Sequence, residues 1–534
     1  MDKFTRLALR AGGIVSAGFV AALAAPAAAA DCSDLANLKL ADGKVTSAAR
    51  IEAGKFSLPQ AAGGPPPGVL AAGFSKLPAF CRVQATMTPT PDSDIKVEVW
   101  LPASGWNGKF VTIGNGVWAG SISYSQMGDP LTRGYAVAAT DTGHTGNGLT
   151  ADWAVGHPEK LVDFGYRAVH ETVVTGKAAV AAFYGAGPKL SFWDSCSTGG
   201  RQGLMEAYRF PADFDAISAM APANPMTELM TQSMWVGWQP NRAPGAKLSP
   251  AKLANVHAAV LGRCDKLDGL EDGLVMNPTA CTFDPASMQC TGAESDSCLT
   301  PVQVETMRAI YDGIRDANGK VVLGGWPYGA EMQLAALTQG PAPFPVALTY
   351  YSMLVFGDRQ DWDWKSFGYI RDRQAGIDYG REILDVPPTG LDAYFARGGK
   401  LLLSHGWNDG LIPAKNSLLF YTMLYHDLPQ QQAQDQLRYY IVPGMEHCSG
   451  GEGVSQFDTL GTIDRWATTG VAPYRIEATR PTVGAGFPGA PPAPPREPLS
   501  RPLCPYPLYA EYDGEGDTAL ASSFTCKPPR EPGA

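Results

Sequence analysis

Short, continuously apolar runs recur in the first and last parts of the chain, and most are followed by a glycine-rich turn. Helical patterns separate several of these runs, at residues 164–184 and 199–208. Continuous hydrophobicity is typical of strands that are buried on both faces. The pattern therefore predicts an α/β fold, with a mostly parallel sheet flanked by helices. The predicted strands are residues 97–101, 110–113, 135–139, 190–193, 214–220, 400–404 and 437–442.

This rhythm stops between residues 223 and 394, a segment rich in methionine, tryptophan, tyrosine and cysteine loops. Its best patterns are separate helices at residues 250–263 and 301–314. Because a chain of this length exceeds one ordinary core, we interpret the segment as a lid domain inserted into the sheet domain. The sheet domain then comprises residues 31–222 and 395–534, and it ends in a proline-rich tail.

Residues 1–30 have the pattern of a secretory signal peptide. Basic residues at the start are followed by the apolar stretch 12–25, and Ala28–Ala30 is a small-residue cleavage site. The apolar stretch is too short for a permanent anchor, and no later stretch reaches the length that a membrane helix needs. We therefore expect cleavage near Ala30 and export to the periplasm or the extracellular medium.

The formal net charge of −10 limits the range of partners. An acidic chain is poorly suited to binding nucleic acid or an anionic membrane surface, and removal of the basic signal peptide makes the charge more negative. We therefore expect neither nucleic acid nor a membrane as a partner. The sequence leaves the oligomeric state open.

All ten cysteines follow the predicted signal peptide, an even number in an oxidising compartment. Short spacing or a position near the chain ends groups eight of them, as Cys32–Cys81, Cys264–Cys281, Cys290–Cys298 and Cys504–Cys526. This grouping leaves Cys196 and Cys448 for each other, although sequence alone does not fix the connectivity. Such a bond would bring the chain neighbours Ser197 and His447 face to face.

Ser197 stands in the motif Asp-Ser-Cys-Ser-Thr-Gly-Gly, between a predicted strand and a predicted helix. A serine on a sharp strand-to-helix turn is the nucleophile elbow of α/β-hydrolases, in which small residues flank the serine. Gly199 fits this pattern, whereas Ser195 stands where the first glycine is expected. Alone, the motif is also typical of an ordinary turn, so a catalytic interpretation needs a matching base and acid.

His447 and Asp409 are the predicted base and acid, since each follows a late predicted strand. Open α/β sheets place their sites at the carboxyl ends of strands, and the order serine, acid, histidine is that of these hydrolases. Seven histidines compete for the role of base. His405 shares the Asp409 loop and is expected to bond it locally, while His144 is expected to support the site.

An acyl-transfer site also needs N–H donors that are in place before the oxyanion forms. The backbone N–H of Thr198, which follows the nucleophile, is one expected donor. The loop Gly114–Gly116 follows an early strand and offers the other, which we assign to Gly116, although a plain glycine turn has the same pattern. A thiolate at Cys196 is a rival nucleophile that a disulfide would exclude.

The lid contains a second motif at residues 264–274, Cys-Asp-Lys-Leu-Asp-Gly-Leu-Glu-Asp-Gly-Leu. The carboxylates of Asp265, Asp268 and Asp272, in a glycine-rich bend, make an oxygen-only cage that suits a hard cation such as calcium. The spacing differs from that of an EF-hand, and an acidic solvated loop is the alternative interpretation. An ion bound here would be structural.

The Cys-Ser, Asp and His-Cys constellation resembles that of the tannase and feruloyl esterase family, and the resemblance covers nearly the whole chain after the signal peptide. It implies an α/β-hydrolase fold, a disulfide beside the triad, and acyl transfer to water through an acyl-enzyme, usually with an aromatic acyl group. It also implies structural calcium in the lid and no organic cofactor. The constellation is Cys196–Ser197, Asp409 and His447–Cys448. The implied calcium ligands are Asp265, Asp268, the Leu270 carbonyl, Asp272 and the Leu274 carbonyl.

We therefore expect a secreted serine carboxylesterase of the feruloyl esterase type, which hydrolyses small-molecule esters of hydroxycinnamic acids. Galloyl esters, as for a tannase, and terephthaloyl esters are close alternatives. The predicted pocket residues, Ile412 and Trp407, say little about which aromatic acyl group fits. A non-catalytic protein that binds aromatic ligands is a different class of function, and the complete triad counts against it.

Overall fold

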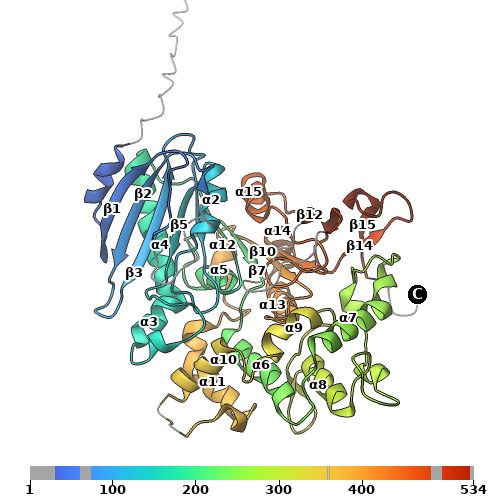
Figure 1. The fold of residues 1–534 in the computed structure, drawn as a ribbon. Coiled ribbons are helices and arrows are strands. Elements are labelled where there is room, and N and C mark those ends of the chain that lie inside the picture. The colour runs from blue at the N-terminus through green and yellow to red at the C-terminus, as the bar shows by residue number, and fades with distance from the viewer. Residues whose placement is uncertain (1–29, 60–73, 358, 360, 483–495, 530–534) are drawn as a thin grey trace, which may run out of the picture.

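The computed structural model describes residues 30–59, 74–357, 359, 361–482 and 496–529 (Figure 1). Nearly all of the predicted signal peptide lies outside the described residues, so cleavage and export stay predictions. Every helix in the described ranges is too short or too polar to span a lipid bilayer.

A nine-stranded sheet forms the centre of the fold. Its strands follow the order β1 (Gly43–Ile51), β2 (Phe80–Met87), β3 (Ile95–Pro102), β5 (Ala136–Thr140), β4 (Lys109–Ile113), β6 (Leu190–Cys196), β7 (Ala216–Met220), β10 (Lys400–Gly406) and β11 (Leu437–Val442). Neighbouring strands from β5 to β11 are parallel, while β1, β2 and β3 join as antiparallel strands at one edge. The predicted α/β fold with a mostly parallel sheet is confirmed.

Helices cover both faces of this sheet. Successive side chains of each strand point to opposite faces, so each strand contributes side chains to two hydrophobic cores. On β10, Leu401 and Leu403 belong to the core beneath one group of helices, and Leu402 belongs to the core beneath the other. The first group is α4 (Ala168–Tyr184), α5 (Thr198–Arg209) and α13 (Ala414–Asp427), and the second is α2 (Tyr124–Thr132) and α15 (Thr459–Thr469). The helix that follows Ser197 therefore lies directly on the sheet.

Some elements differ from the sequence prediction. The strands β1 and β2 were not predicted, and the helix expected at 164–184 is a π-helical turn, Asp163–Arg167, followed by α4. The helix expected at 301–314 ends at Asp312 because Gly313 adopts a φ of 78°, and Ile314 begins a short strand instead.

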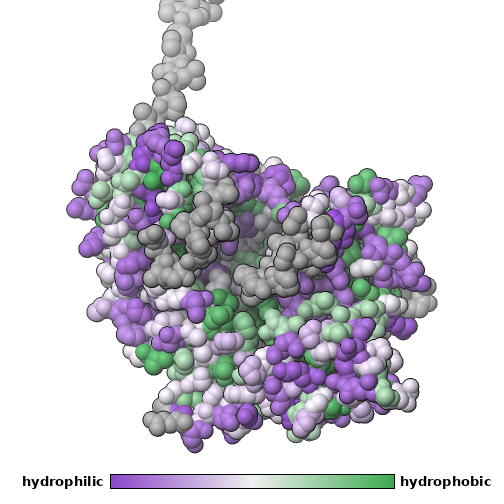
Figure 2. All heavy atoms as spheres, viewed as in Figure 1, coloured by the Kyte–Doolittle hydropathy of each residue, from purple (hydrophilic) through white to green (hydrophobic). Residues whose placement is uncertain are grey.

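Between β7 and β10 the chain forms the mostly helical segment that the sequence analysis interpreted as a lid (Figure 1). Its helices are α6 (Met226–Trp238), α7 (Pro250–Cys264), α8 (Pro301–Asp312), α9 (Glu331–Thr338), α10 (Pro345–Thr349), α11 (Arg371–Leu384) and α12 (Asp392–Ala396). The boundary proposed at residue 394 falls inside α12, where Tyr394 and Phe395 pack in the sheet core. Figure 2 shows a mostly hydrophilic surface, with apolar residues gathered near the middle of the view.

The C-terminal region is more ordered than a proline-rich tail suggests. Its described residues form two antiparallel strand pairs, and Cys504–Cys526 joins the residue that follows β13 to β15. The pairs are β12 (Ile476–Arg480) with β13 (Leu499–Leu503), and β14 (Tyr509–Tyr512) with β15 (Phe524–Lys527). All ten cysteines are bonded, in the grouping that the sequence indicated: Cys32–Cys81, Cys196–Cys448, Cys264–Cys281, Cys290–Cys298 and Cys504–Cys526.

Close packing of α5 on β6 yields a prediction for Gly203. A Cβ added there would lie 2.4 Å from Cδ1 of the buried Trp193, so Gly203→Ala should destabilise the fold by about 1–3 kcal/mol through overpacking. Gly262, on the exposed face of α7, has open space, and Gly262→Ala should stabilise by up to about 1 kcal/mol through helix propensity. Denaturant and thermal unfolding of both variants test this pair of predictions. An equal change in the free energy of unfolding, with the same sign for both variants, would contradict them.

Candidate active site

Ser197 lies on the turn between β6 and α5, with φ 66° and ψ −127°. A non-glycine residue adopts such a backbone only where its surroundings enforce it. Gly199 makes the tight turn possible, because a Cβ at this position would lie 2.1 Å from the Ser195 hydroxyl oxygen. The Gly199 N–H also donates to the Asn115 carbonyl at 2.8 Å. Ser195, which departs from the usual first glycine, thus fits because Gly199 has no side chain.

The three predicted triad residues meet in one line of hydrogen bonds. His447 Nε2 lies 2.9 Å from Ser197 Oγ, and His447 Nδ1 lies 2.7 Å from Asp409 Oδ2. Asp409 follows β10 and His447 follows β11, at the carboxyl ends of these parallel strands. The arrangement can take a proton from the hydroxyl and hold the resulting imidazolium beside a carboxylate.

The Asp409 carboxylate is fully buried and has several hydrogen-bond partners. Its Oδ1 accepts the N–H groups of Leu411 and Ile412, both at 2.8 Å, and its Oδ2 lies 3.1 Å from His405 Nε2. Burial raises the pKa of Asp409, but His447 and His405 outweigh it and lower that pKa well below its ordinary value. Asp409 therefore stays ionised, and His405 bonds it locally, as predicted.

A disulfide joins the residue before Ser197 to the residue after His447. The Cys196–Cys448 bond has an S–S distance of 2.02 Å and a Cα–Cα distance of 6.0 Å. Cys448 has a φ of 64°, so the histidine loop turns sharply where it meets the bond. Because Cys196 is bonded, it offers no thiolate, and the rival cysteine nucleophile is excluded in this structure.

One expected oxyanion donor, Thr198, is the first residue of α5, and the other, Gly116, lies on the loop that packs against it. Asn115 is held next to α5, since its N–H donates to Gln202 Oε1 at 3.0 Å and its side-chain oxygen accepts from Gln202 Nε2 at 3.1 Å. A Cβ on Gly116 would meet nothing within 4 Å, so this loop borders open space. In the hydrogen bonds found between described residues, neither the Gly116 nor the Thr198 N–H is a donor. Both groups are therefore available to a bound oxygen.

Two contacts from the helical insertion reach the triad loops, and the sequence analysis missed both. Gln333 Oε1, on α9, accepts the N–H of His447 at 3.1 Å and that of Gly410 at 2.9 Å. No sequence motif marks this amide, which lies more than a hundred residues from His447. It becomes recognisable only when the insertion is placed against the sheet.

The second contact is a charged cluster around His257 of α7. Its Nδ1 lies 2.7 Å from Glu331 Oε2, and its Nε2 lies 2.9 Å from Glu452 Oε2, on the loop that follows Cys448. Burial lowers the pKa of His257, but the two glutamates outweigh it and raise that pKa to about 10. A cationic imidazole thus joins the insertion to the histidine loop.

The predicted pocket residues are both buried next to Asp409. Ile412 and Trp407 are each 4% exposed, and the Ile412 carbonyl lies 3.2 Å from His405 Nε2. His144 stacks on Trp153 at a ring distance of 3.7 Å. Burial is the main cause that lowers the pKa of His144 to about 4. His144 is therefore neutral and contributes packing, and a role for Ile412 and Trp407 in substrate binding stays a prediction.

The predicted calcium loop contains one buried carboxylate oxygen that fits a cation, although the carboxylates of Asp265, Asp268 and Asp272 do not form a group whose ligand atoms all lie within 4.8 Å of one another. Asp268 is fully buried, and its Oδ2 has no hydrogen-bond partner among the described residues. Burial, with Asp272 and Asp265 nearby, raises the pKa of Asp268 to about 7. Asp265 accepts the N–H groups of Asp272 at 3.2 Å and Gly273 at 2.9 Å, and Asp272 pairs with the buried Arg501. The unpaired Asp268 oxygen is the feature that a bound cation would satisfy.

Comparison with known proteins shows the family of this chain. The family model described as tannase and feruloyl esterase matches residues 81–527. An uncharacterized esterase of Xanthomonas campestris pv. campestris is 34% identical over 95% of this chain and 92% of the relative. The mono(2-hydroxyethyl) terephthalate hydrolase of Piscinibacter sakaiensis is 31% identical over 86% of each chain. The crystal structure of feruloyl esterase B from Aspergillus oryzae has a TM-score of 0.81 and 26% identity, over 93% of this chain and 99% of that chain. The chain therefore belongs to the tannase and feruloyl esterase family of carboxylic ester hydrolases.

Proposed function

We propose that this protein is a secreted serine carboxylesterase that hydrolyses esters of aromatic acids through an acyl-enzyme, with hydroxycinnamic acids as the preferred acyl group. The observation that carries the proposal is the hydrogen-bonded line from Ser197 through His447 to Asp409. Five disulfides and a signal-peptide pattern support export from the cytoplasm.

In the proposed mechanism, Ser197 Oγ attacks the ester carbonyl while His447 takes its proton. The N–H groups of Thr198 and Gly116 stabilise the oxyanion. His447 then returns the proton to the leaving alcohol, and Asp409 holds the imidazole tautomer and balances its charge. Water enters, His447 takes a proton from it, and collapse of the second tetrahedral intermediate releases the acid and regenerates the serine.

The relatives support an aromatic acyl group and leave three candidates, of which galloyl esters are the one that the tannase part of the family description favours. Similarity to feruloyl esterase B favours hydroxycinnamoyl esters. The mono(2-hydroxyethyl) terephthalate hydrolase favours terephthaloyl esters as the second candidate. A non-catalytic binder is disfavoured, because a binding protein has no need of a serine, a histidine and an aspartate in hydrogen-bond order.

The acyl preference is tested by hydrolysis of methyl ferulate, methyl gallate and mono(2-hydroxyethyl) terephthalate, side by side. We expect the highest kcat/KM with methyl ferulate. Ser197→Ala should lower kcat by at least roughly 10⁴-fold on every substrate, because no nucleophile remains. Faster hydrolysis of the gallate or of the terephthalate ester would make that ester the correct candidate. Turnover by Ser197→Ala at the wild-type rate would refute the serine mechanism.

Removal of the Cys196–Cys448 bond should reduce both activity and stability. The bond joins residues 252 positions apart, so on the loop-entropy model its removal should lower the free energy of unfolding by up to about 5 kcal/mol. Loosening the Ser197–His447 contact should lower kcat by about 100-fold, the usual cost of a misplacement near 1 Å. The Cys196→Ala/Cys448→Ala double variant tests this in kinetic and melting experiments.

The control is the double variant Cys290→Ala/Cys298→Ala, which removes a bond of sequence separation 8 in the insertion. Its kcat should stay near that of the wild type. If kcat is retained when Cys196 and Cys448 are replaced, the bond does not position the base.

We also propose that calcium binds the loop 264–274, where Asp265, Asp268 and Asp272 and the Leu270 and Leu274 carbonyls would hold it in a structural role. Calcium should raise the melting temperature of the wild type, and Asp268→Asn should abolish both the rise and the bound calcium measured by mass spectrometry. Glu271→Gln is the matched control, because Glu271 is exposed in the same loop and pairs with Lys266 at 3.0 Å. A calcium response that Asp268→Asn keeps would rule out this site.

A further inference from the structure

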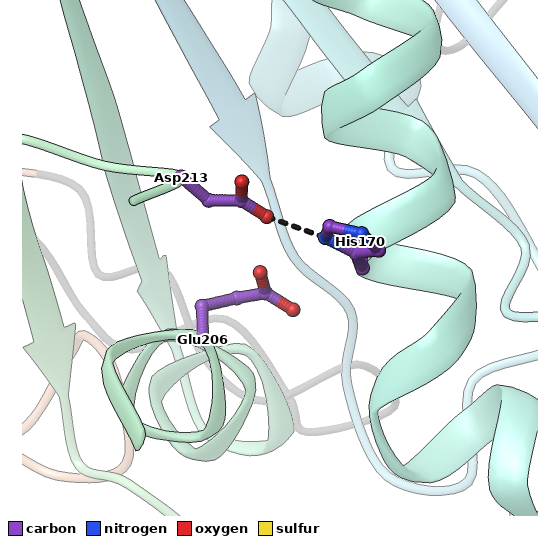
Figure 3. Close-up of side chains that lie close together, drawn as sticks. All are labelled: His170, Glu206 and Asp213. Atoms are coloured by element: carbon purple, nitrogen blue, oxygen red, sulfur yellow. Dashed lines mark hydrogen bonds and ion pairs between the residues drawn. The ribbon is translucent and has the colours of Figure 1, made fainter. Parts of the chain in front are cut away.

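A group of metal-ligand side chains lies between α4 and the last turn of α5, away from both sites described above. His170 comes from α4, Glu206 from α5 and Asp213 from the turn that leads to β7. One ligand atom of each lies within 4.8 Å of the others, and the described residues contain no other such group. Figure 3 shows the three side chains pointing toward one another.

Glu206 is the unusual member of this group. It is 1% exposed, and neither of its carboxylate oxygens has a hydrogen-bond donor among the described residues. The cationic side chain of Lys177 bonds the main-chain oxygen of Asp213 at 2.5 Å, and in the described part of the chain no ion pair joins it to either carboxylate. The Lys177 charge acts on Glu206 from a distance, and the Asp213 carboxyl is its neighbour. No cation of the described residues forms an ion pair with the Glu206 carboxylate, so an ion bound here would lower the cost of burying it.

The His170 ring is held in place and remains reachable. Its Nδ1 lies 2.7 Å from Asp213 Oδ2, and the ring stacks on Phe210 with centroids 3.9 Å apart. The His170 side chain is 30% exposed and that of Asp213 is 13% exposed, so two of the three ligand residues can be reached from solvent. One imidazole nitrogen with two carboxylates suits a divalent first-row metal such as zinc better than calcium.

We propose that His170, Glu206 and Asp213 form a binding site for a divalent transition-metal ion, with zinc as its representative. The ion would connect α4, the C-terminal turn of α5 and the turn before β7. Since α5 begins directly after Ser197, the ion would lie roughly 14 Å along the helix axis from the nucleophile. Its role is therefore structural: it holds the far end of the helix that positions the serine.

The test is a zinc titration of the full protein by calorimetry, with saturating calcium present so that the lid loop is occupied by calcium. We expect about one zinc ion per chain, and a melting temperature that rises with zinc. His170→Asn and Glu206→Gln should each weaken zinc binding by more than the roughly 10–100-fold that loss of an outer-shell partner costs. Cobalt(II) should give visible absorption bands with the wild type that both variants lack.

His157→Asn is the matched control, because His157 Nδ1 also lies 2.7 Å from an aspartate, Asp92, and it belongs to no group of three ligands among the described residues. This variant should bind zinc as the wild type does. Circular dichroism without metal checks that each variant is folded, and His170 is exposed enough for its replacement to be tolerated. A wild type that binds no zinc, or Glu206→Gln binding zinc as tightly as the wild type, would overturn the proposal, and Glu206 would then be a protonated partner of Asp213.

Discussion

The contact between the Ser197 hydroxyl and the His447 imidazole is the constraint on which the site depends, because sheet geometry alone does not produce it. Two strands, β7 and β10, separate β6 from β11, so the ends of β6 and β11 are roughly 14 Å apart at the usual strand spacing. The histidine loop must therefore fold back across two strands. The Cys196–Cys448 bond, with its Cα–Cα distance of 6.0 Å, keeps the loop in that position.

The helical insertion provides the second restraint on the same loop. Gln333 accepts N–H groups from both the Asp409 loop and the His447 loop, so one amide oxygen fixes the acid and the base relative to each other. The His257 imidazolium adds a charged contact just beyond Cys448. The insertion is thus part of the framework that aligns the triad, and its removal would leave the disulfide as the remaining long-range restraint described here.

The parts that the sequence predicted well are those with a strong local cause. Strands buried on both faces leave uninterrupted apolar runs, and a triad at strand ends follows from chain order and from the paired cysteines. By contrast, β1 lies at the sheet edge, where its residues range from half-buried to exposed, so no continuous apolar run marked it. Gln333 bonds partners distant in the sequence, and Glu206 meets His170 of another helix, which no spacing rule reveals.

Helix α5 is closely packed on the sheet, follows the strained turn of Ser197 at one end, and carries the buried Glu206 carboxylate near the other. Its first turns approach β6 and β7 so closely that Gly199, Gly200 and Gly203 leave no room for a Cβ, and the turn before them sets the strained backbone of Ser197. Close packing also buries the other end of the helix, where Glu206 is removed from water beside Asp213. Because the helix is a rigid unit packed along its length, a displacement that returned Glu206 to solvent would also move the serine. A cation or a proton at Glu206 would therefore act on the same packed helix that positions Ser197.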